Sequence, residues 1–220
     1  MSGATSRVAG FSFADYYTDG ELWSDVLVKR RSYRDMKLDQ LRAEILPSIY
    51  GPGLIWISQL YRVPAFVPVT RRKNWRIEPF AERHMAGMLL LHEVVPDRSS
   101  QFDTAWSVWK ALDRFGFAES DVMLPCWKKD TGIGGDADGV TLAVTGYLKG
   151  REKVLLVVFN NRDVPVSFRI ALDTGKLFGR QGKILVTDLE RAAELHRGAP
   201  DFTVSVPMRD FVLLEAKPLP

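Results

Sequence analysis

The chain of 220 residues has 46% hydrophobic and 26% charged residues and a net charge of +3, an ordinary composition for a globular protein. Such a weak positive charge does not indicate a nucleic-acid or membrane partner, and no apolar run reaches the roughly 20 residues that cross a bilayer. The single cysteine, Cys126, excludes an internal disulfide and a cysteine-based zinc site.

The first part of the chain predicts alternating helices and strands. Residues 24–46 begin with two candidate N-cap residues, Ser24 and Asp25, and end just before Pro47, which predicts a charged helix. Residues 54–60 form a short apolar run after a Gly-Pro-Gly turn, and residues 88–95 form a second run of the same kind. Such runs predict strands that are buried on both faces, as in a parallel sheet.

Two further helices are expected beside these strands. Pro79 stands where a helix begins, and residues 80–87 have helical spacing. The clearest helix starts with Ser100 and Asp103, which resemble a capping box, and it stops at Gly116. Its apolar stripe consists of Phe102, Trp106, Trp109, Leu112 and Phe115. Strands and helices in this order are typical of βα units.

Beyond Asp130 the pattern changes to one of strands alone. Residues 131–139 are rich in glycine and aspartate, which predicts a loop or linker. Six strands are expected at residues 140–144, 154–159, 164–172, 184–189, 202–206 and 211–215. Their spacing predicts a small antiparallel β-sandwich. The fold class is therefore α/β followed by all-β, with an α/β domain over residues 1–130 and a sandwich domain over residues 131–220.

Four polar residues are candidates for binding a substrate. His92 and Glu93 lie at the carboxyl end of the strand expected at 88–95, and Gln59 and Arg62 lie at the equivalent end of the earlier strand. Barrel enzymes place functional side chains at these ends. Adjacent residues of a strand point to opposite faces, however, so only one of His92 and Glu93 can face a shared pocket. The alternative is that this pair anchors the following loop.

Other motifs give weaker indications. The glycine-rich stretch after Thr131 lacks the lysine and the helix of a phosphate-binding loop, and Asp130, Asp136 and Asp138 do not have the spacing of a calcium loop. The three histidines show no metal-ligand spacing. The basic run at 71–76 is better explained as a solvated loop than as a nucleic-acid site. We therefore expect no metal, no cofactor and no nucleic-acid partner.

Several stretches together resemble the C-terminal part of proteins similar to glycoside hydrolase family 123. They are residues 37–47, 51–60, 87–93, 154–160 and the closing segment 206–214, and the resemblance covers nearly all of the chain from about residue 12. It implies the last units of a β/α (TIM-type) barrel, followed by a C-terminal antiparallel β-sandwich. It also implies a carbohydrate partner, with N-acetylhexosaminides as candidate substrates, and a parent protein outside the cytoplasm.

The resemblance further implies that this chain is one part of a longer enzyme. A complete barrel takes about 250 residues, and only about 125 precede the expected sandwich. The missing N-terminal part of the barrel is then the expected partner. The family's catalytic pair is an adjacent aspartate and glutamate, and no Asp-Glu dipeptide occurs in this sequence. We therefore assign no catalytic residue to the chain, and we expect the catalytic carboxylates upstream of Met1.

A second reading is a free-standing carbohydrate-binding or structural module without catalytic activity. Such a module would have to cover both faces of its parallel strands without further barrel units. The apolar runs at 54–60 and 88–95 argue against it, because a monomer that exposed them would associate.

Overall fold

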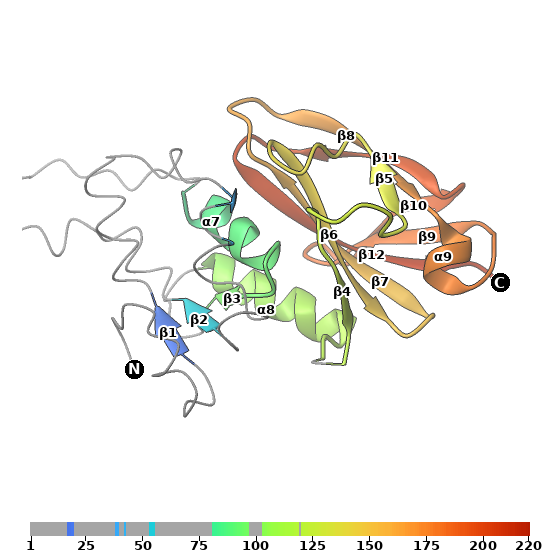
Figure 1. Ribbon diagram of the computed structural model, residues 1–220, viewed down its shortest axis with the longest axis horizontal. Helices are drawn as coiled ribbons and strands as arrows, with labels where there is room; N and C mark the ends of the chain where they lie inside the picture. The colour runs from blue at the N-terminus through green and yellow to red at the C-terminus, as the bar shows by residue number, and fades with distance from the viewer. Residues whose placement is uncertain are drawn as a thin grey trace, which may run out of the picture. The chain divides into compact units, whose positions relative to one another are not determined.

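The computed structural model describes residues 17–19, 38–39, 42, 53–55, 81–96, 103–118 and 120–220 (Figure 1). The chain forms two compact units, Met1–Ala105 and Trp106–Pro220, here called the N-terminal unit and the sandwich unit. The boundary between the two units lies between residues 105 and 106, whereas the domains expected from the sequence are residues 1–130 and 131–220.

The N-terminal unit contains a small parallel sheet. Its strands are β1 (Tyr17–Asp19), β2 (Gly53–Ile55) and β3 (Val95–Pro96), in the order β1-β2-β3. Leu54 of β2 pairs with Thr18 on one side and with Val95 on the other. Parallel pairing was expected for the run at 54–60, whose last five residues lie outside the described part of the chain. Three short parallel strands fit a barrel segment and an open sheet equally well.

The strand predicted at 88–95 is wrong over most of its length. Residues Ala81–Leu90 form a helix, α7, and β3 starts only at Val95. All residues from His84 to Leu91 are buried, so the helix is enclosed on every side. A short apolar run cannot be assigned to a buried strand or a buried helix from its periodicity alone, because both lack an exposed polar face.

Helix α8 (Asp103–Phe115) ends where the sequence predicts. Gly116 adopts a left-handed conformation (φ 73°), and the N–H groups of Gly116 and Phe117 bond to the carbonyls of Asp113 and Leu112, as in a Schellman motif. The buried stripe is only partly the predicted one: Leu112 and Phe115 are buried, but Trp106 is 56% exposed. The other buried residues of α8 are Thr104, Val108 and Ala111.

The sandwich unit consists of two antiparallel sheets, as predicted (Figure 1). The larger sheet has the order β10-β9-β12-β7-β6-β4, and the smaller sheet has the order β11-β8-β5. The strands are β4 (Val122–Leu124), β5 (Ile133–Gly135), β6 (Leu142–Lys149), β7 (Lys153–Asn160), β8 (Val166–Leu172), β9 (Ile184–Asp188), β10 (Ala193–Gly198), β11 (Asp201–Val206) and β12 (Asp210–Pro218). A one-turn helix, α9 (Thr174–Phe178), connects β8 to β9.

The segment expected to be a linker belongs to the sandwich. Strand β5 pairs with β8, with Ile133 opposite Leu172 and Gly135 opposite Ile170. A Cβ atom on Gly135 would lie 2.1 Å from the carbonyl oxygen of Arg169, so only glycine allows this close approach. Strands β4 and β5 have three residues each, which is too short for an alternating pattern to appear in the sequence.

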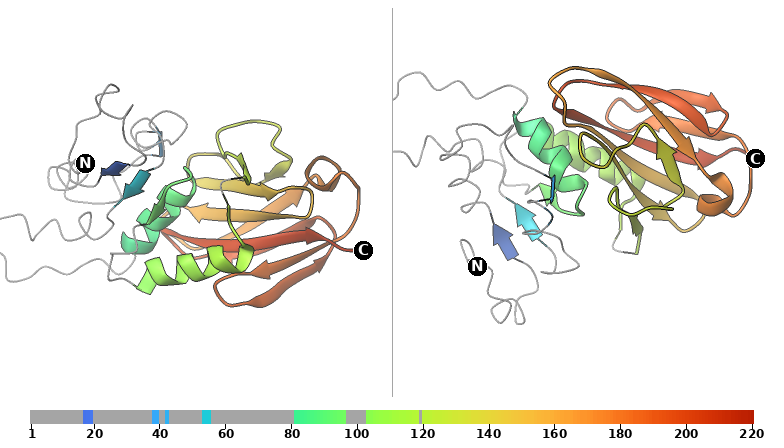
Figure 2. Two further views of the ribbon diagram at one scale, coloured as in Figure 1. Left: turned by 90° about the horizontal axis from the view of Figure 1, so that it is seen from below. Right: turned by 45° about the horizontal axis from the view of Figure 1, so that its top comes forward.

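The larger sheet is apolar on both faces at its centre. On β7, Val154, Leu156 and Val158 belong to the core between the sheets, and the intervening Leu155, Val157 and Phe159 lie on the outer face; all six are fully buried. Helix α8 runs along this outer face (Figure 2). Burial of each such side chain stabilises the fold by about 1.5–3 kcal/mol.

Polar contacts attach α8 to two regions of the larger sheet, one near β9 and one near β7. Near β9, the Ser107 hydroxyl donates to Glu190 (2.8 Å) and the Arg114 guanidinium donates to the carbonyl oxygen of Leu189 (2.5 Å). Near β7, the Lys153 ammonium lies 4.7 Å from the ring centroid of Phe115. Helix α8 is therefore a layer of the sandwich unit rather than only the last helix of a barrel.

We expect a fragment of residues 103–220 to fold and a fragment of residues 131–220 to fail. The shorter fragment lacks α8 and β4, so the apolar outer face of β7 would be exposed to water. Circular dichroism, thermal unfolding and size-exclusion chromatography of the two fragments test this. In the longer fragment, Leu112→Asp should reproduce the failure, since it places a charge under α8. A monomeric 131–220 fragment with cooperative unfolding would contradict the expectation.

Candidate functional site

The structure describes two of the four candidate binding residues. Gln59 and Arg62 lie outside the described residues. His92 and Glu93 lie in the turn between α7 and β3, and not at the end of a strand. The N–H groups of His92 and Val94 both bond to the carbonyl oxygen of Leu89, at 2.9 and 3.1 Å. The turn therefore closes the carboxyl end of α7 in the manner of a Schellman motif.

Glu93 occupies the position of this turn that usually holds glycine. Its φ of 65° is in the left-handed region, which costs an ordinary residue about 1 kcal/mol. Glu93 is exposed, and partial burial of its carboxyl group raises its pKa. The turn thus presents a carboxyl group to solvent in a conformation that the helix end fixes.

His92 is buried, and its side chain forms a hydrogen bond to the last part of α7. Its side chain is 1% exposed, and Nδ1 donates a hydrogen bond of 2.7 Å to the carbonyl oxygen of Met88. Burial lowers the pKa of His92 to about 4, an effect that Arg42 reinforces and that the bond to Met88 and the charge of Asp39 oppose. His92 is therefore neutral at pH 7. Of this pair, only Glu93 is exposed to solvent.

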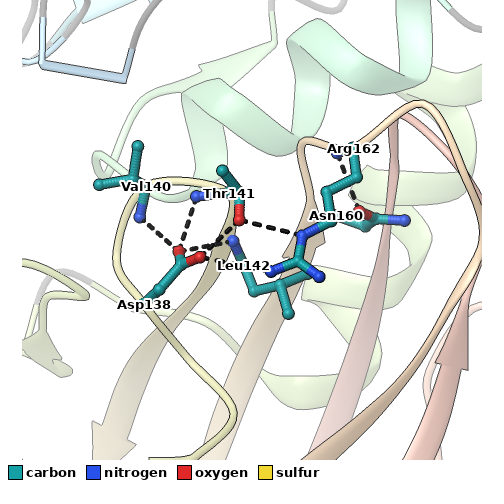
Figure 3. A network of polar contacts seen from close by, with 6 residues as sticks. All are labelled: Asp138, Val140, Thr141, Leu142, Asn160 and Arg162. Atoms are coloured by element: carbon teal, nitrogen blue, oxygen red, sulfur yellow. Dashed lines mark hydrogen bonds and ion pairs between the residues drawn. The ribbon is translucent and has the colours of Figure 1, made fainter.

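A second polar cluster joins three loops at one end of the sandwich, and Figure 3 shows the residues of the first two. Asp138, in the loop between β5 and β6, accepts hydrogen bonds from the backbone N–H groups of Val140 (2.8 Å), Thr141 (2.6 Å) and Leu142 (2.8 Å). The Thr141 hydroxyl also donates to this carboxylate, and the Arg162 guanidinium lies 3.5 Å from it. These groups hold the loop in one conformation.

The hydrogen bonds keep Asp138 ionised. Partial burial alone would raise its pKa, but the bonds from Leu142, Thr141 and Val140 outweigh burial and lower the pKa to about 2. A carboxyl group with such a pKa cannot act as a general acid near neutral pH, because it carries no proton to give.

The cluster continues through the loop between β7 and β8. Arg162 donates from Nε to the Thr141 hydroxyl (3.0 Å) and from its backbone N–H to the side-chain oxygen of Asn160 (2.9 Å). Asn160 is fully buried, and its amide donates to the carbonyl oxygens of Val164 and Pro207, each at 2.8 Å. The side chain of Asn160 therefore connects the second loop to the third, between β11 and β12.

Arg209 completes the connection from the third loop. Its guanidinium forms two bonds of 3.1 Å to the carboxylate of Asp163 and one of 2.7 Å to Asn161. Its backbone N–H bonds to the carbonyl oxygen of Arg162 at 3.1 Å. The polar groups of this cluster are thus used in bonds with one another, which indicates a structural role rather than acid–base chemistry.

The described residues show no other site of recognised chemistry. Among them, no group of three or more His, Cys, Asp and Glu side chains is placed to hold a metal ion. In the same part of the chain, no helix has the length and apolar character needed to cross a membrane. Sequence reasoning considered Asp138 only as a calcium ligand and overlooked its turn. The signal was present, because an aspartate followed by a turn glycine and a threonine is typical of side-chain capping of a loop.

Solved structures resemble this fold, although the chain matches no protein-family model and a search of curated proteins gives no match. One is a GH27 β-L-arabinopyranosidase variant from Geobacillus stearothermophilus in complex with arabinose, with a TM-score of 0.54 and 8% identity over 100% of this chain and 50% of that one. Another is a maltogenic α-amylase, AmyB, from Thermotoga neapolitana, with a TM-score of 0.51 and 13% identity over 96% of this chain and 52% of that one.

The chain has a glycoside-hydrolase-like fold. At 8% and 13% identity the likeness concerns the fold alone, and it does not single out family 123. The antiparallel sandwich of this chain corresponds to the C-terminal β-sandwich of glycosidases, whereas the TIM-barrel portion is not established. The chain spans about half of the length of these two solved structures, 50% and 52%.

We expect His92 to remain neutral until the pH falls to about 4. The unfolded chain binds this proton near pH 6.5, so protonation favours the unfolded state between these two values. The end of α7 should lose up to about 3 kcal/mol of stability across this window and be fully stable above it. Histidine ring NMR and amide exchange of α7 between pH 3 and 8 measure both effects. His92→Asn, which can donate a hydrogen bond but does not titrate, should remove the dependence; a ring that titrates near 6.5 would contradict the burial.

We expect Asp138→Ala to destabilise the sandwich unit by about 1–2 kcal/mol at pH 7, as loss of a capping side chain does elsewhere. The pKa of Asp138 is lowered on folding, so its contribution is present above about pH 4 and is lost as the pH falls toward 2. Denaturant unfolding at pH 7 and pH 2 should therefore show a smaller difference between variant and wild type at the lower pH. Asp113→Ala, at an exposed aspartate of α8 with an ordinary helical backbone, is the control. An equal difference at both pH values would argue against the ionised network.

Proposed function

We propose that this chain is the C-terminal part of a carbohydrate-active, glycoside-hydrolase-like protein, and that the whole protein hydrolyses glycosidic bonds. The observation that carries the proposal is the two-layer antiparallel sandwich, which together with the preceding α/β segment resembles an arabinopyranosidase and an amylase over 96% or more of this chain. A carbohydrate is the expected ligand because both of these proteins are named for enzymes that act on carbohydrates.

In this proposal the catalytic carboxylates come from another part of the protein. Most glycoside hydrolases place two carboxyl groups on either side of the scissile bond, one of which carries a proton. Asp138 does not suit the protonated role, because its low pKa keeps it ionised. The sequence also lacks the Asp-Glu dipeptide that the resemblance to family 123 would require. This chain would supply one rim of the sugar site and an accessory sandwich.

The rim of the sugar site would consist of Gln59, Arg62 and Glu93, with His92 as a positioning residue. The exposed Glu93 supports this, since it can accept hydrogen bonds from sugar hydroxyls while the turn holds it in place. N-acetylhexosaminides are the first substrates to test, on the strength of the resemblance at residues 37–60 and 87–93.

The test begins with the source DNA upstream of the Met1 codon. We expect an open reading frame that encodes further apolar strands and a pair of acidic residues. The extended protein should hydrolyse aryl N-acetylhexosaminides or aryl pentosides, and the 220-residue chain alone should not. If the extended protein is inactive and the chain alone binds glycans in affinity electrophoresis, the chain is a binding module. If the chain alone is active, the catalytic groups lie within it; either result overturns the proposal.

In the active extended protein we expect Glu93→Gln to raise KM about fivefold, the effect of weakening one hydrogen bond. The kcat should change little, because in this proposal Glu93 binds the sugar at the rim of the site and does not contact the reacting atoms. Asp113→Asn, at an exposed carboxylate of α8, is the matched control and should leave both parameters unchanged. A large fall in kcat for Glu93→Gln would assign it to the catalytic machinery instead.

A further inference from the structure

The loop between β5 and β6 contains an Asp-Gly pair, a dipeptide whose aspartate isomerises readily in unfolded chains. The sequence has two such pairs, at residues 19–20 and 138–139, and the structure describes both residues of the second pair only. Glycine has no side chain to hinder attack of its nitrogen on the preceding carboxyl group. Asp138 is exposed to solvent, so water reaches the pair. The pair therefore has the composition and the exposure of a modification site.

Isomerisation of this aspartate requires no reagent other than water. In the first step the nitrogen of Gly139 would bond to the side-chain carboxyl carbon of Asp138. The nitrogen gives up its proton and the carbon gives up its hydroxyl, and these leave as one water molecule. Water then opens the resulting five-membered succinimide ring. Opening at the side-chain carbonyl restores aspartate, whereas opening at the main-chain carbonyl gives isoaspartate, whose main chain passes through the side-chain carbon.

The folded loop opposes the first step at both reacting groups. The N–H group of Gly139 donates to the carbonyl oxygen of Leu142 at 3.0 Å, so this nitrogen is already engaged. The carboxyl group of Asp138 accepts bonds from three backbone N–H groups and is held ionised, and an ionised carboxylate has no hydroxyl to lose. Both groups must leave these bonds before they can react with each other.

The loop nevertheless requires the glycine that makes the pair reactive. Gly139 has a φ of 74°, in the left-handed region that favours glycine. A Cβ atom at this position would lie 3.3 Å from the carbonyl oxygen of Cys126, which is a tight contact with another segment of backbone. A larger residue would therefore strain the turn, and protection of the pair has to come from the hydrogen bonds around it.

We propose that Asp138–Gly139 is an isomerisation site that the surrounding polar cluster protects, and that the reaction proceeds only through an opened form of the loop. Surface loops open at a lower free energy than the folded core. The isoaspartate product has an extra carbon in its main chain, so its carboxylate no longer lies where the three N–H groups can share it. The inference concerns a chemical modification of the sandwich unit and is independent of the proposed hydrolytic function.

The first measurement compares the 220-residue chain with a synthetic peptide of residues 132–141, which lacks Leu142 and Arg162. Both are kept at about pH 5, where a free aspartate with a pKa of about 3.9 is still partly protonated. Isoaspartate at position 138 is measured by chromatography and mass spectrometry after proteolytic digestion. We expect it to form at least tenfold more slowly in the folded chain than in the peptide. Equal rates in the two, or no isoaspartate in the peptide, would overturn the proposal.

Variants of the full chain test whether the cluster determines the rate. Thr141→Val keeps the branched shape but removes the hydroxyl that donates to Asp138 and accepts from Arg162. We expect isoaspartate to form about fivefold faster in this variant, the effect of one lost hydrogen bond on the opening of the loop. Arg197→Gln, which breaks an exposed ion pair with Glu194 on β10, is the matched control and should leave the rate unchanged. An unchanged rate in Thr141→Val, or an equal increase in both variants, contradicts control by the loop.

Discussion

The structure depends above all on the burial of β7 from both sides. Consecutive side chains of β7, such as Leu155 and Leu156, point to opposite faces of the larger sheet, and both sets are excluded from water. Antiparallel sheets commonly have one solvated face, so the burial of both faces is unusual. One face requires the smaller sheet, and the other requires a helix. The sandwich therefore cannot be separated from α8 without exposing several large apolar side chains, which agrees with a compact unit that includes α8 from Trp106 onward.

Polar groups then determine how the ends of the sandwich are closed. Asn160, Arg162 and Arg209 connect three loops through bonds that leave each carboxylate paired. A network satisfied in this way stabilises one loop conformation, and it also leaves no group poised for proton transfer. The carboxylates of this network accordingly have structural roles in the sandwich unit. Glu93 is the exception, since an exposed carboxyl group there occupies a backbone conformation that favours glycine.

The local sequence was sufficient to predict an element where its apolar residues recur with one clear period or where a cap marks its end. The alternation in β8 and β11 predicted the antiparallel sandwich, and the cap at Gly116 predicted the end of α8. It was insufficient where a segment is buried on all sides, because the apolar residues of such a segment show no period. The run that ends in His92 is apolar all round, so nothing in it distinguished the helix α7 from a strand. His92 and Glu93 were therefore predicted at the end of a strand. In the structure both lie in the turn after α7, where His92 is buried at the end of the helix.

The sequence by itself determined the fold class of the second half, the absence of a disulfide and the absence of an Asp-Glu pair, because each depends on residue identity or on a period of two. Only the tertiary structure decided which strands pair and where the compact unit begins. Strands β4 and β5 exist because β6 and β8 offer them a partner. Pairing over such distances is a property of the assembled sheets, and three residues are too few to carry a signal for it.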